Sequence, residues 1–159
     1  MSIPSRLSSY LSQRGANYDI YPHDHSRTSA ETARSAHVPA HQLAKSVLLE
    51  DDSGCVMAVV PADRTVMLGE ISRILGRRNL RLSDETRISM LFADCDRGAV
   101  PPVGMAWGIE TIVDEDLEGN DYVYMEGGDH ERLLRMSGDD FQLLMEKQRH
   151  GHFCKGMTH

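Results

Sequence analysis

Apolar residues recur along much of this chain at intervals of three and four, the spacing of one helical face. Ile3, Leu7 and Leu11 follow Ser2 in this pattern, and Gly15 is typical of a helix end. The helices predicted in this way lie between Pro4 and Gly15, over residues 29–36 behind a Thr28–Glu31 capping box, before Gly76, after Ser83-Asp84-Glu85 and after Ser137.

Other segments are short, rich in β-branched residues and bounded by turn residues, which indicates strands. Asp51-Asp52-Ser53-Gly54 separates the runs 45–50 and 55–60, and this arrangement predicts a hairpin. Further strands are predicted over residues 18–21, 110–113, 121–125 and 132–136. Because helices and strands do not alternate strictly, we expect an α/β (α+β) domain with a mixed, curved sheet rather than a doubly wound fold.

Length and composition favour one globular unit. The chain has 159 residues, of which 40% are hydrophobic and 26% charged, and these values suit a single packed core. We assign the domain to residues 1–149 and expect a flexible tail over 150–159. No apolar run is long enough to span a bilayer, and the N-terminus lacks the apolar core of a signal peptide. No membrane association and a cytoplasmic location are therefore expected.

Charge is distributed unevenly. The formal net charge of −7 argues against a general nucleic-acid coat. The segment 64–87 nevertheless concentrates arginines, among them Arg73, Arg77 and Arg78, which are candidates for contacts with phosphate. A solvated helical surface explains the same pattern, and charge alone does not separate the two interpretations.

Neither a metal site nor a disulfide framework is expected. Cys55, Cys95 and Cys154 are widely spaced and form no CxxC pair. His23-Asp24-His25 and the pair His37 and His41 lack an obvious third ligand. The sequence also has no phosphate-binding loop, dinucleotide fingerprint or nucleophile elbow, so no cofactor is expected.

Lys45 stands at the entrance to the apolar run Val47-Leu48-Leu49. A lysine at the mouth of a buried strand can point into a cleft, where low dielectric strengthens its hold on a phosphate or carbonyl oxygen. A position on the surface is the ordinary alternative.

The segment 98–104, Gly-Ala-Val-Pro-Pro-Val-Gly, contains no charged side chain. Prolines fix the backbone while the flanking glycines allow a ligand to approach closely, and the N–H groups of Ala99, Val100, Val103 and Gly104 are candidate donors to an oxyanion. A rigid structural connection is the alternative.

Downstream, Gly127-Gly128-Asp129-His130-Glu131 lies between two predicted strands. The glycine pair places His130 on a turn, where it can donate a hydrogen bond to a substrate carbonyl or polarise water. An ordinary hairpin turn with an exposed histidine fits equally well.

Taken together, Leu43-Ala44-Lys45-Ser46, Gly98-(x)3-Pro102-x-Gly104 and Gly127-Gly128-Asp129-His130 resemble the YbaK/ProX-type aminoacyl-tRNA deacylases, the prolyl-tRNA-synthetase-associated editing domains. The resemblance covers about residues 3–146 and implies a barrel-like sheet. It implies hydrolysis of the ester that joins a wrong amino acid to the terminal adenosine of a tRNA, with the ribose hydroxyl or a water held by it attacking.

The resemblance also assigns roles to residues. It implies that Lys45 holds the polar groups of the substrate without acting as a nucleophile, with Gly98, Pro102 and His130 as the other catalytic residues. The remaining substrate-binding residues would be Tyr21, Ser46, Ala99, Val100, Pro101, Gly104 and Gly128.

The chain departs from the family pattern at two places. Pro101 stands where many relatives have serine, and Ser46 stands where others carry asparagine or threonine. These departures leave the edited amino acid open, with alanine or cysteine on a proline-type tRNA as the expected class. The expected partners are the acceptor end of tRNA and an aminoacyl-tRNA synthetase. The rival interpretation is a module of the same fold that binds a tRNA end or a synthetase without catalysis.

Overall fold

The computed structural model describes residues 3–24 and 28–156. Ser2, His25 and the last three positions of the predicted tail lie outside the described residues. The strands are β1 (Asp19–Pro22), β2 (Leu43–Asp51), β3 (Gly54–Pro61), β4 (Arg64–Val66), β5 (Arg81–Leu82), β6 (Glu110–Asp114), β7 (Tyr122–Glu126), β8 (Arg132–Ser137), β9 (Arg149–Gly151) and β10 (Cys154–Gly156).

Five α-helices and three 3-10 turns connect these strands within the described ranges. They are α1 (Ser5–Gln13), α2 (Ser29–Ala36), η1 (Ala40–Gln42), α3 (Leu68–Leu75), α4 (Glu85–Leu91), η2 (Gly104–Trp107), η3 (Glu115–Leu117) and α5 (Gly138–Met145). The predicted caps at Thr28 and Ser137 are confirmed, since Thr28 accepts from the amide of Glu31 and Ser137 from that of Asp140. The cap predicted at Ser83 is wrong by one residue, because Asp84 caps α4 by accepting from the amide of Arg87. None of the described helices has the length and apolar character needed to cross a membrane.

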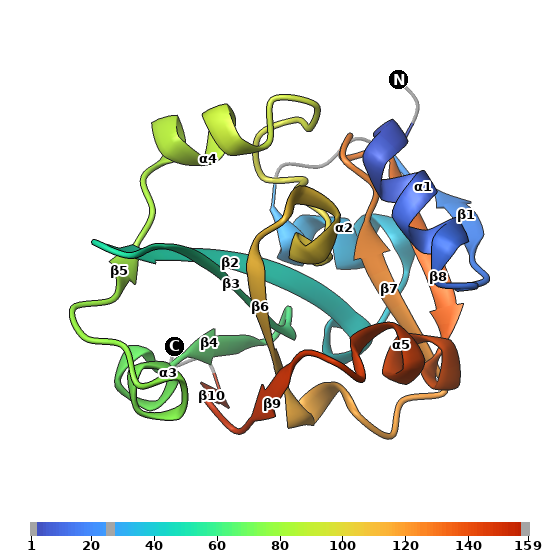
Figure 1. Cartoon of the computed structure of the whole chain (residues 1–159). Coiled ribbons are helices and arrows are strands. Elements are labelled where there is room, and N and C mark those ends of the chain that lie inside the picture. Colours follow the sequence, from blue (N-terminus) through green and yellow to red (C-terminus); the bar gives the residue numbers. More distant parts are fainter. Residues whose placement is uncertain (1–2, 25–27, 157–159) are drawn as a thin grey trace.

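The main sheet is mixed, as predicted. Its strand order is β1-β8-β7-β2-β3-β6-β9, with β5 pairing with β2 off this path. The β2–β3 hairpin is antiparallel, whereas β2 pairs with β7, and β3 with β6, in parallel. Figure 1 shows the long β2–β3 hairpin crossing the molecule, with β7, β8 and β1 beyond one end and β5 and α3 at the other.

Side-chain alternation along β2 and β3 divides the core between the two faces of the sheet. On one face, Ala44 and Leu48 join the cluster that contains Leu7 and Leu11 of α1. On the other face, Leu49 joins a cluster beneath α3, β4 and β10. The register pairs Lys45 with Val60 of this second cluster and Ser46 with Val59 of the first. The side chains of neighbouring residues in β2 therefore point to opposite faces of the sheet.

The expectation of a flexible tail from residue 150 is wrong for residues 150–156. β9 pairs in parallel with β6, and β10 pairs antiparallel with β4. Phe153 is fully buried, and its amide donates to the Asp114 carboxylate at 2.8 Å. Burial of a phenylalanine and pairing of the backbone on both sides of it hold this segment against the sheet.

Candidate functional site

One edge of β2 changes its neighbour partway along the strand. β7 pairs with Leu43 and Ala44, and β5 pairs with Leu49 and Glu50. Among the described strands, none is registered with residues 45–47 on this edge. Backbone N–H and C=O groups at such a gap can form hydrogen bonds with a ligand, as they would with a neighbouring strand.

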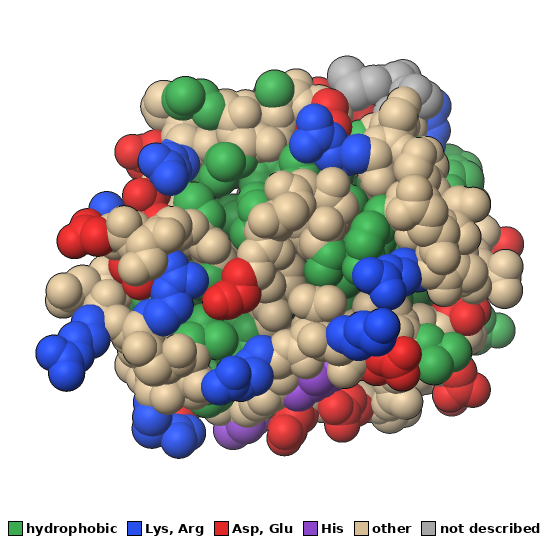
Figure 2. Space-filling view, in the orientation of Figure 1, with side chains coloured by type: hydrophobic (Ala, Val, Ile, Leu, Met, Phe, Trp, Pro, Cys, Tyr) green, Lys and Arg blue, Asp and Glu red, His purple; other side chains and the backbone are tan. Residues whose placement is uncertain are grey.

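A cavity of about 260 Å³ lies beside this gap, between β2, β5 and α4. Its apolar lining includes Leu48, Ile88 and Val100. Figure 2 shows hydrophobic side chains in the hollow beneath α4. The complete lining consists of Ser46, Val47, Leu48, Leu82, Ser83, Glu85, Ile88, Gly98 and Val100. The cavity is therefore apolar inside, with hydroxyl groups and one carboxylate among its lining residues.

Gly98 and Val100 of the 98–104 loop line this cavity. The Ser46 hydroxyl donates to the Val100 carbonyl at 3.0 Å, which fixes the loop against the edge of β2. Gly98 has a φ of 80°, a conformation in which a side chain is strained. The structure thus brings together Ser46, Gly98 and Val100, all three of which were predicted from the sequence.

The other residues of this loop are held by hydrogen bonds and close packing within the protein. The prediction of a free Ala99 amide is wrong, because this group donates to the Asp96 carbonyl at 3.0 Å. A Cβ atom added to Gly104 would lie 2.5 Å from Thr111 Oγ1, so close packing accounts for this glycine without a ligand. Pro101 and Pro102 are both buried. They shape the loop from within and do not line the cavity.

Lys45 lies at the same gap in β2, and its side chain points to the face of the strand opposite to that of Ser46. It is half-buried, and the described part of the chain gives it no hydrogen bond or ion pair. Burial lowers the pKa of Lys45, while the nearby Asp63 carboxylate opposes this shift. Since Lys45 and Ser46 are adjacent on an open edge, a ligand that crosses the edge can meet the ammonium group and the cavity together.

His130 is buried and does not line the cavity. Its Nε2–H donates to the carbonyl of Arg97, the residue before Gly98. The Gly128 carbonyl accepts from the Asp96 amide at 2.7 Å, and a Cβ at Gly128 would lie 3.0 Å from Pro4 Cδ. The β7–β8 turn therefore anchors the start of the loop, which makes His130 and Gly128 positioning residues in this geometry.

Tyr21 lies on β1, away from the residues that line the cavity. Its ring packs edge-on against Tyr124, with the centroids 5.6 Å apart. Both rings pack against the cluster that contains Leu43 and Leu133, on the Lys45 face of the sheet. Tyr21 therefore does not contact a ligand in the cavity in this arrangement.

The three arginines predicted to meet phosphates differ in their surroundings. Arg77 binds the Asp51 carboxylate in a bidentate manner, at 2.8 and 2.5 Å, and also the Gly54 carbonyl. Arg73 pairs with Glu70 at 2.7 Å on the surface. Arg78 is exposed, and the described residues offer it no such partner. Arg77 is thus a structural residue, whereas Arg78 keeps its charge available.

Sequence reasoning missed a buried carboxyl group on β7. Glu126 is almost fully buried, and its Oε1 accepts from the Thr32 hydroxyl of α2 at 2.9 Å. Burial raises the pKa of Glu126 to about 7, and the neighbouring Asp129 adds to this effect. A charged residue that ends an otherwise apolar strand was the signal available in the sequence.

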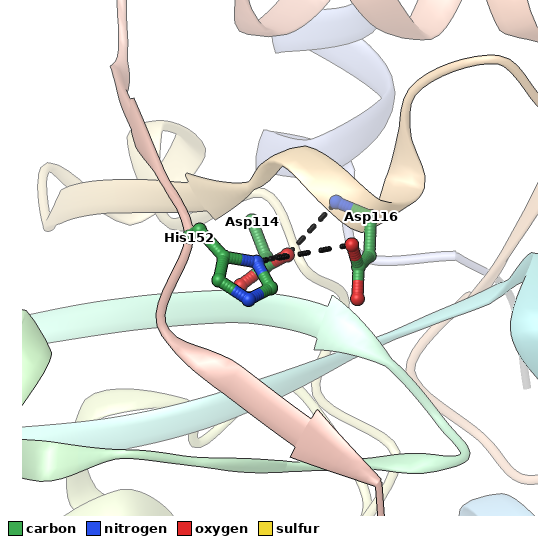
Figure 3. Close-up of side chains that lie close together, drawn as sticks. All are labelled: Asp114, Asp116 and His152. Atoms are coloured by element: carbon green, nitrogen blue, oxygen red, sulfur yellow. Dashed lines mark hydrogen bonds and ion pairs between the residues drawn. The ribbon is translucent and has the colours of Figure 1, made fainter.

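A second missed group consists of Asp114, Asp116 and His152, whose donor atoms lie within 4.8 Å of one another. Figure 3 shows the two carboxylates and the imidazole converging from η3, the end of β6 and the link between β9 and β10. The sequence pattern placed His152 in a flexible tail, which hid its proximity to the Asp-x-Asp segment. These three residues are the ones in the described chain with the geometry to hold a metal.

Comparison with known proteins places this geometry in a family. The sequence profile described as the aminoacyl-tRNA editing domain matches residues 23–144. No curated protein sequence matches the chain.

Solved structures show the same fold over nearly the whole chain. A protein described as a candidate trans-editing enzyme for prolyl-tRNA synthetase is 25% identical, with a TM-score of 0.80 over 95% of this chain and 96% of its own. A scaffold protein used for computational epitope grafting is also 25% identical, with a TM-score of 0.79 over 96% of both chains. A hypothetical protein that is 22% identical gives a TM-score of 0.83 over 95% of this chain and all of its own.

Proposed function

Because the chain belongs to the aminoacyl-tRNA editing domain family, we propose that it is a trans-acting deacylase of mischarged tRNA. The proposed reaction is hydrolysis of the ester between an amino acid and the terminal ribose. The observation that carries the proposal is the gap in β2, where Lys45, Ser46 and the 98–104 loop meet at an unpaired strand edge.

The aminoacyl group would lie across this gap. Its side chain would enter the cavity beside Ser46 and Val100, while its ester carbonyl would lie against the edge near Lys45. The Lys45 ammonium group is half-buried and has no partner among the described residues, so it can stabilise negative charge that develops on the carbonyl oxygen. Burial that lowers the pKa of Lys45 also strengthens such a contact, because fewer waters compete for it.

The carboxylate in the cavity lining, Glu85, pairs with Arg97 at 3.1 Å, and the proposed mechanism assigns no side chain as general base. An aminoacyl ester is already activated, and positioning a water or the neighbouring ribose hydroxyl can supply much of the acceleration. The attacking water oxygen would bond to the carbonyl carbon, the bond to the ribose oxygen would break, and the ribose oxygen would take up the proton. In this mechanism Lys45 stabilises the negative charge on the carbonyl oxygen and does not act as a nucleophile.

The cavity suits the side chain of an amino acid. Its volume of about 260 Å³ lies below the range of roughly 300–1,000 Å³ typical of sites for larger ligands. Leu48, Ile88 and Val100 give it an apolar lining, and Ser46 provides a hydroxyl. Alanine and cysteine fit this combination of size and polarity. A proline-type tRNA is the proposed carrier, which agrees with the solved structure of a candidate trans-editing enzyme for prolyl-tRNA synthetase.

The test is ester hydrolysis on a panel of aminoacyl-tRNAs that includes alanyl- and cysteinyl-tRNA with a proline-type body. We expect accelerated release of at least one small amino acid relative to the spontaneous rate, and little effect on a bulky aromatic amino acid. A panel that shows no acceleration while the protein still binds tRNA would instead support the binding module of the same fold.

A further inference from the structure

We propose that Asp114, Asp116 and His152 form a binding site for a divalent first-row transition-metal ion, with Zn²⁺ as the best match. The ion would fasten the C-terminal segment to the sheet. This site is separate from the cavity of the proposed deacylase, and the inference does not depend on that activity.

Three donor atoms converge at this place from segments that are distant in the sequence. His152 Nδ1 lies 4.0 Å from Asp114 Oδ1 and 3.9 Å from Asp116 Oδ1. Both distances exceed those of a hydrogen bond, so the imidazole and the carboxylates face one another without bonding directly. Ligands around a tetrahedral zinc ion at about 2.0–2.1 Å lie about 3.3 Å apart. The three donor atoms lie within 4.8 Å of one another, so small inward movements of the exposed His152 and the partly exposed Asp116 side chains would bring them to this spacing.

The charge at this place also favours a cation. Asp114 is fully buried, and its two oxygens accept from the amides of Asp116 and Phe153, both at 2.8 Å. Within the described ranges, no lysine or arginine lies within ion-pair distance of Asp114, and His152 is its partner. Buried carboxylates are ordinarily paired with a cation or bound to a metal.

The neighbouring groups are compatible with this assignment. Asp116 Oδ2 faces Arg64 Nε at 3.4 Å and Cys154 Sγ at 3.4 Å, which leaves Oδ1 directed towards His152. An imidazole together with two carboxylates suits borderline metals such as Zn²⁺ and does not suit Mg²⁺ or Ca²⁺.

The position of the site suggests what the ion would do. Asp114 and Asp116 flank the junction of β6 and η3, and His152 lies between β9 and β10. The Asp114 bond to Phe153 already joins these segments. An ion at the site adds a second link between the core sheet and the C-terminal segment, and it would bind the folded chain in preference to the unfolded one.

The experiment uses the full, untagged chain after dialysis against a chelator. Calorimetric titration with ZnCl₂ is expected to show one equivalent bound, and Co²⁺ is expected to give the visible bands of a low-symmetry site. At free Zn²⁺ near 100 times the dissociation constant, the thermal midpoint is expected to rise by about 5–10 °C. MgCl₂ is expected to give no such rise.

Matched variants decide whether these residues are the ligands. Asp116→Asn and His152→Ala change partly exposed side chains, and each is expected to weaken Zn²⁺ binding by about 100-fold or more. His37→Asn and Asp121→Asn serve as controls at exposed positions, and asparagine suits the φ of 57° at His37. The proposal is overturned if the dialysed chain binds no Zn²⁺, or if both ligand variants bind it as tightly as the controls.

Discussion

The hydroxyl of Ser46 donates a 3.0 Å hydrogen bond to the carbonyl of Val100, which joins the open edge of β2 to a loop 54 residues further along the chain. The bond sets the width of the cavity, since both residues line it. Substrate selection in the proposed function therefore depends on a contact that holds two walls together.

Ser46→Ala removes this bond and leaves the Val100 carbonyl without its donor. We expect the free energy of unfolding to fall by about 0.5–1.5 kcal/mol. Because the loop is then free to move, we also expect kcat/KM for the preferred aminoacyl-tRNA to fall about tenfold. Denaturant unfolding and ester hydrolysis measure the two effects. Ser9→Ala, at an exposed site on α1, is the control, and equal activity in both variants would contradict a role for this bond.

His130 is expected to act through the loop and not on the substrate. His130→Asn keeps a residue that tolerates the φ of 52° but shortens the donor to the Arg97 carbonyl. We expect KM to rise several-fold, about 3- to 10-fold, with the pH profile of kcat unchanged in shape. Loss of one limb of that profile with KM unchanged would instead favour the direct chemical role that the sequence suggested.

Much of the fold follows from local patterns. The β2–β3 hairpin is where the Asp51–Gly54 tetrad places it, because the Asp51 carboxylate accepts from the amides of Ser53 and Gly54 within the turn. The capped helices and the mixed sheet follow in the same way. The C-terminal strands did not follow from local patterns, because Phe153 and Cys154 carry no periodic pattern and depend on partners in β4 and β6.

The candidate site was predictable in its residues but not in their arrangement. Lys45 and Ser46 were identified together, yet strand alternation sends them to opposite faces of β2. Gly104 matches the predicted glycine pattern, but a glycine is required there because the Thr111 side chain leaves no room for a Cβ atom. Glu126 was overlooked because its partner, Thr32, lies 94 residues away on α2. Contacts of this range depend on the tertiary fold and leave no local signal.

The buried Glu126 carboxyl makes stability depend on pH. Its pKa in the folded chain is about 7, above the ordinary value of 4.5, so the folded state holds a proton that the unfolded state releases. The stability of the wild-type chain is therefore expected to fall as pH rises from about 4.5 to 7, by up to about 3 kcal/mol.

Glu126→Gln removes this titration while keeping an acceptor for the Thr32 hydroxyl. The variant is expected to match the wild type near pH 4.5 and to be the more stable of the two at pH 8. Urea unfolding across this range measures the difference. A gap that stays constant with pH would show that Glu126 does not carry the predicted proton.

The arginines of the α3 region are expected to separate into two classes. Arg78→Ala should weaken binding of tRNA and reduce the slope of log affinity against log salt by about 1, with the thermal midpoint unchanged. Arg77→Ala should lower the thermal midpoint, because Asp51, whose pKa Arg77 holds at about 2, loses its partner. Filter binding at several salt concentrations and thermal melts provide the measurements, with Arg34→Ala as the control. Equal salt slopes for Arg78→Ala and the control would show that Arg78 does not contact tRNA phosphates.

The most direct test of the proposed function compares Lys45→Ala with Lys147→Ala, an exposed lysine beyond α5, in hydrolysis of alanyl- and cysteinyl-tRNA. Lys45→Ala is expected to lose at least about tenfold in kcat/KM, corresponding to about 1.4 kcal/mol of transition-state stabilisation, while its thermal midpoint stays at or above that of the wild type. Lys147→Ala is expected to retain full activity. Full activity in Lys45→Ala, with the chain folded and tRNA bound, would contradict the proposal that this ammonium group stabilises the reacting ester.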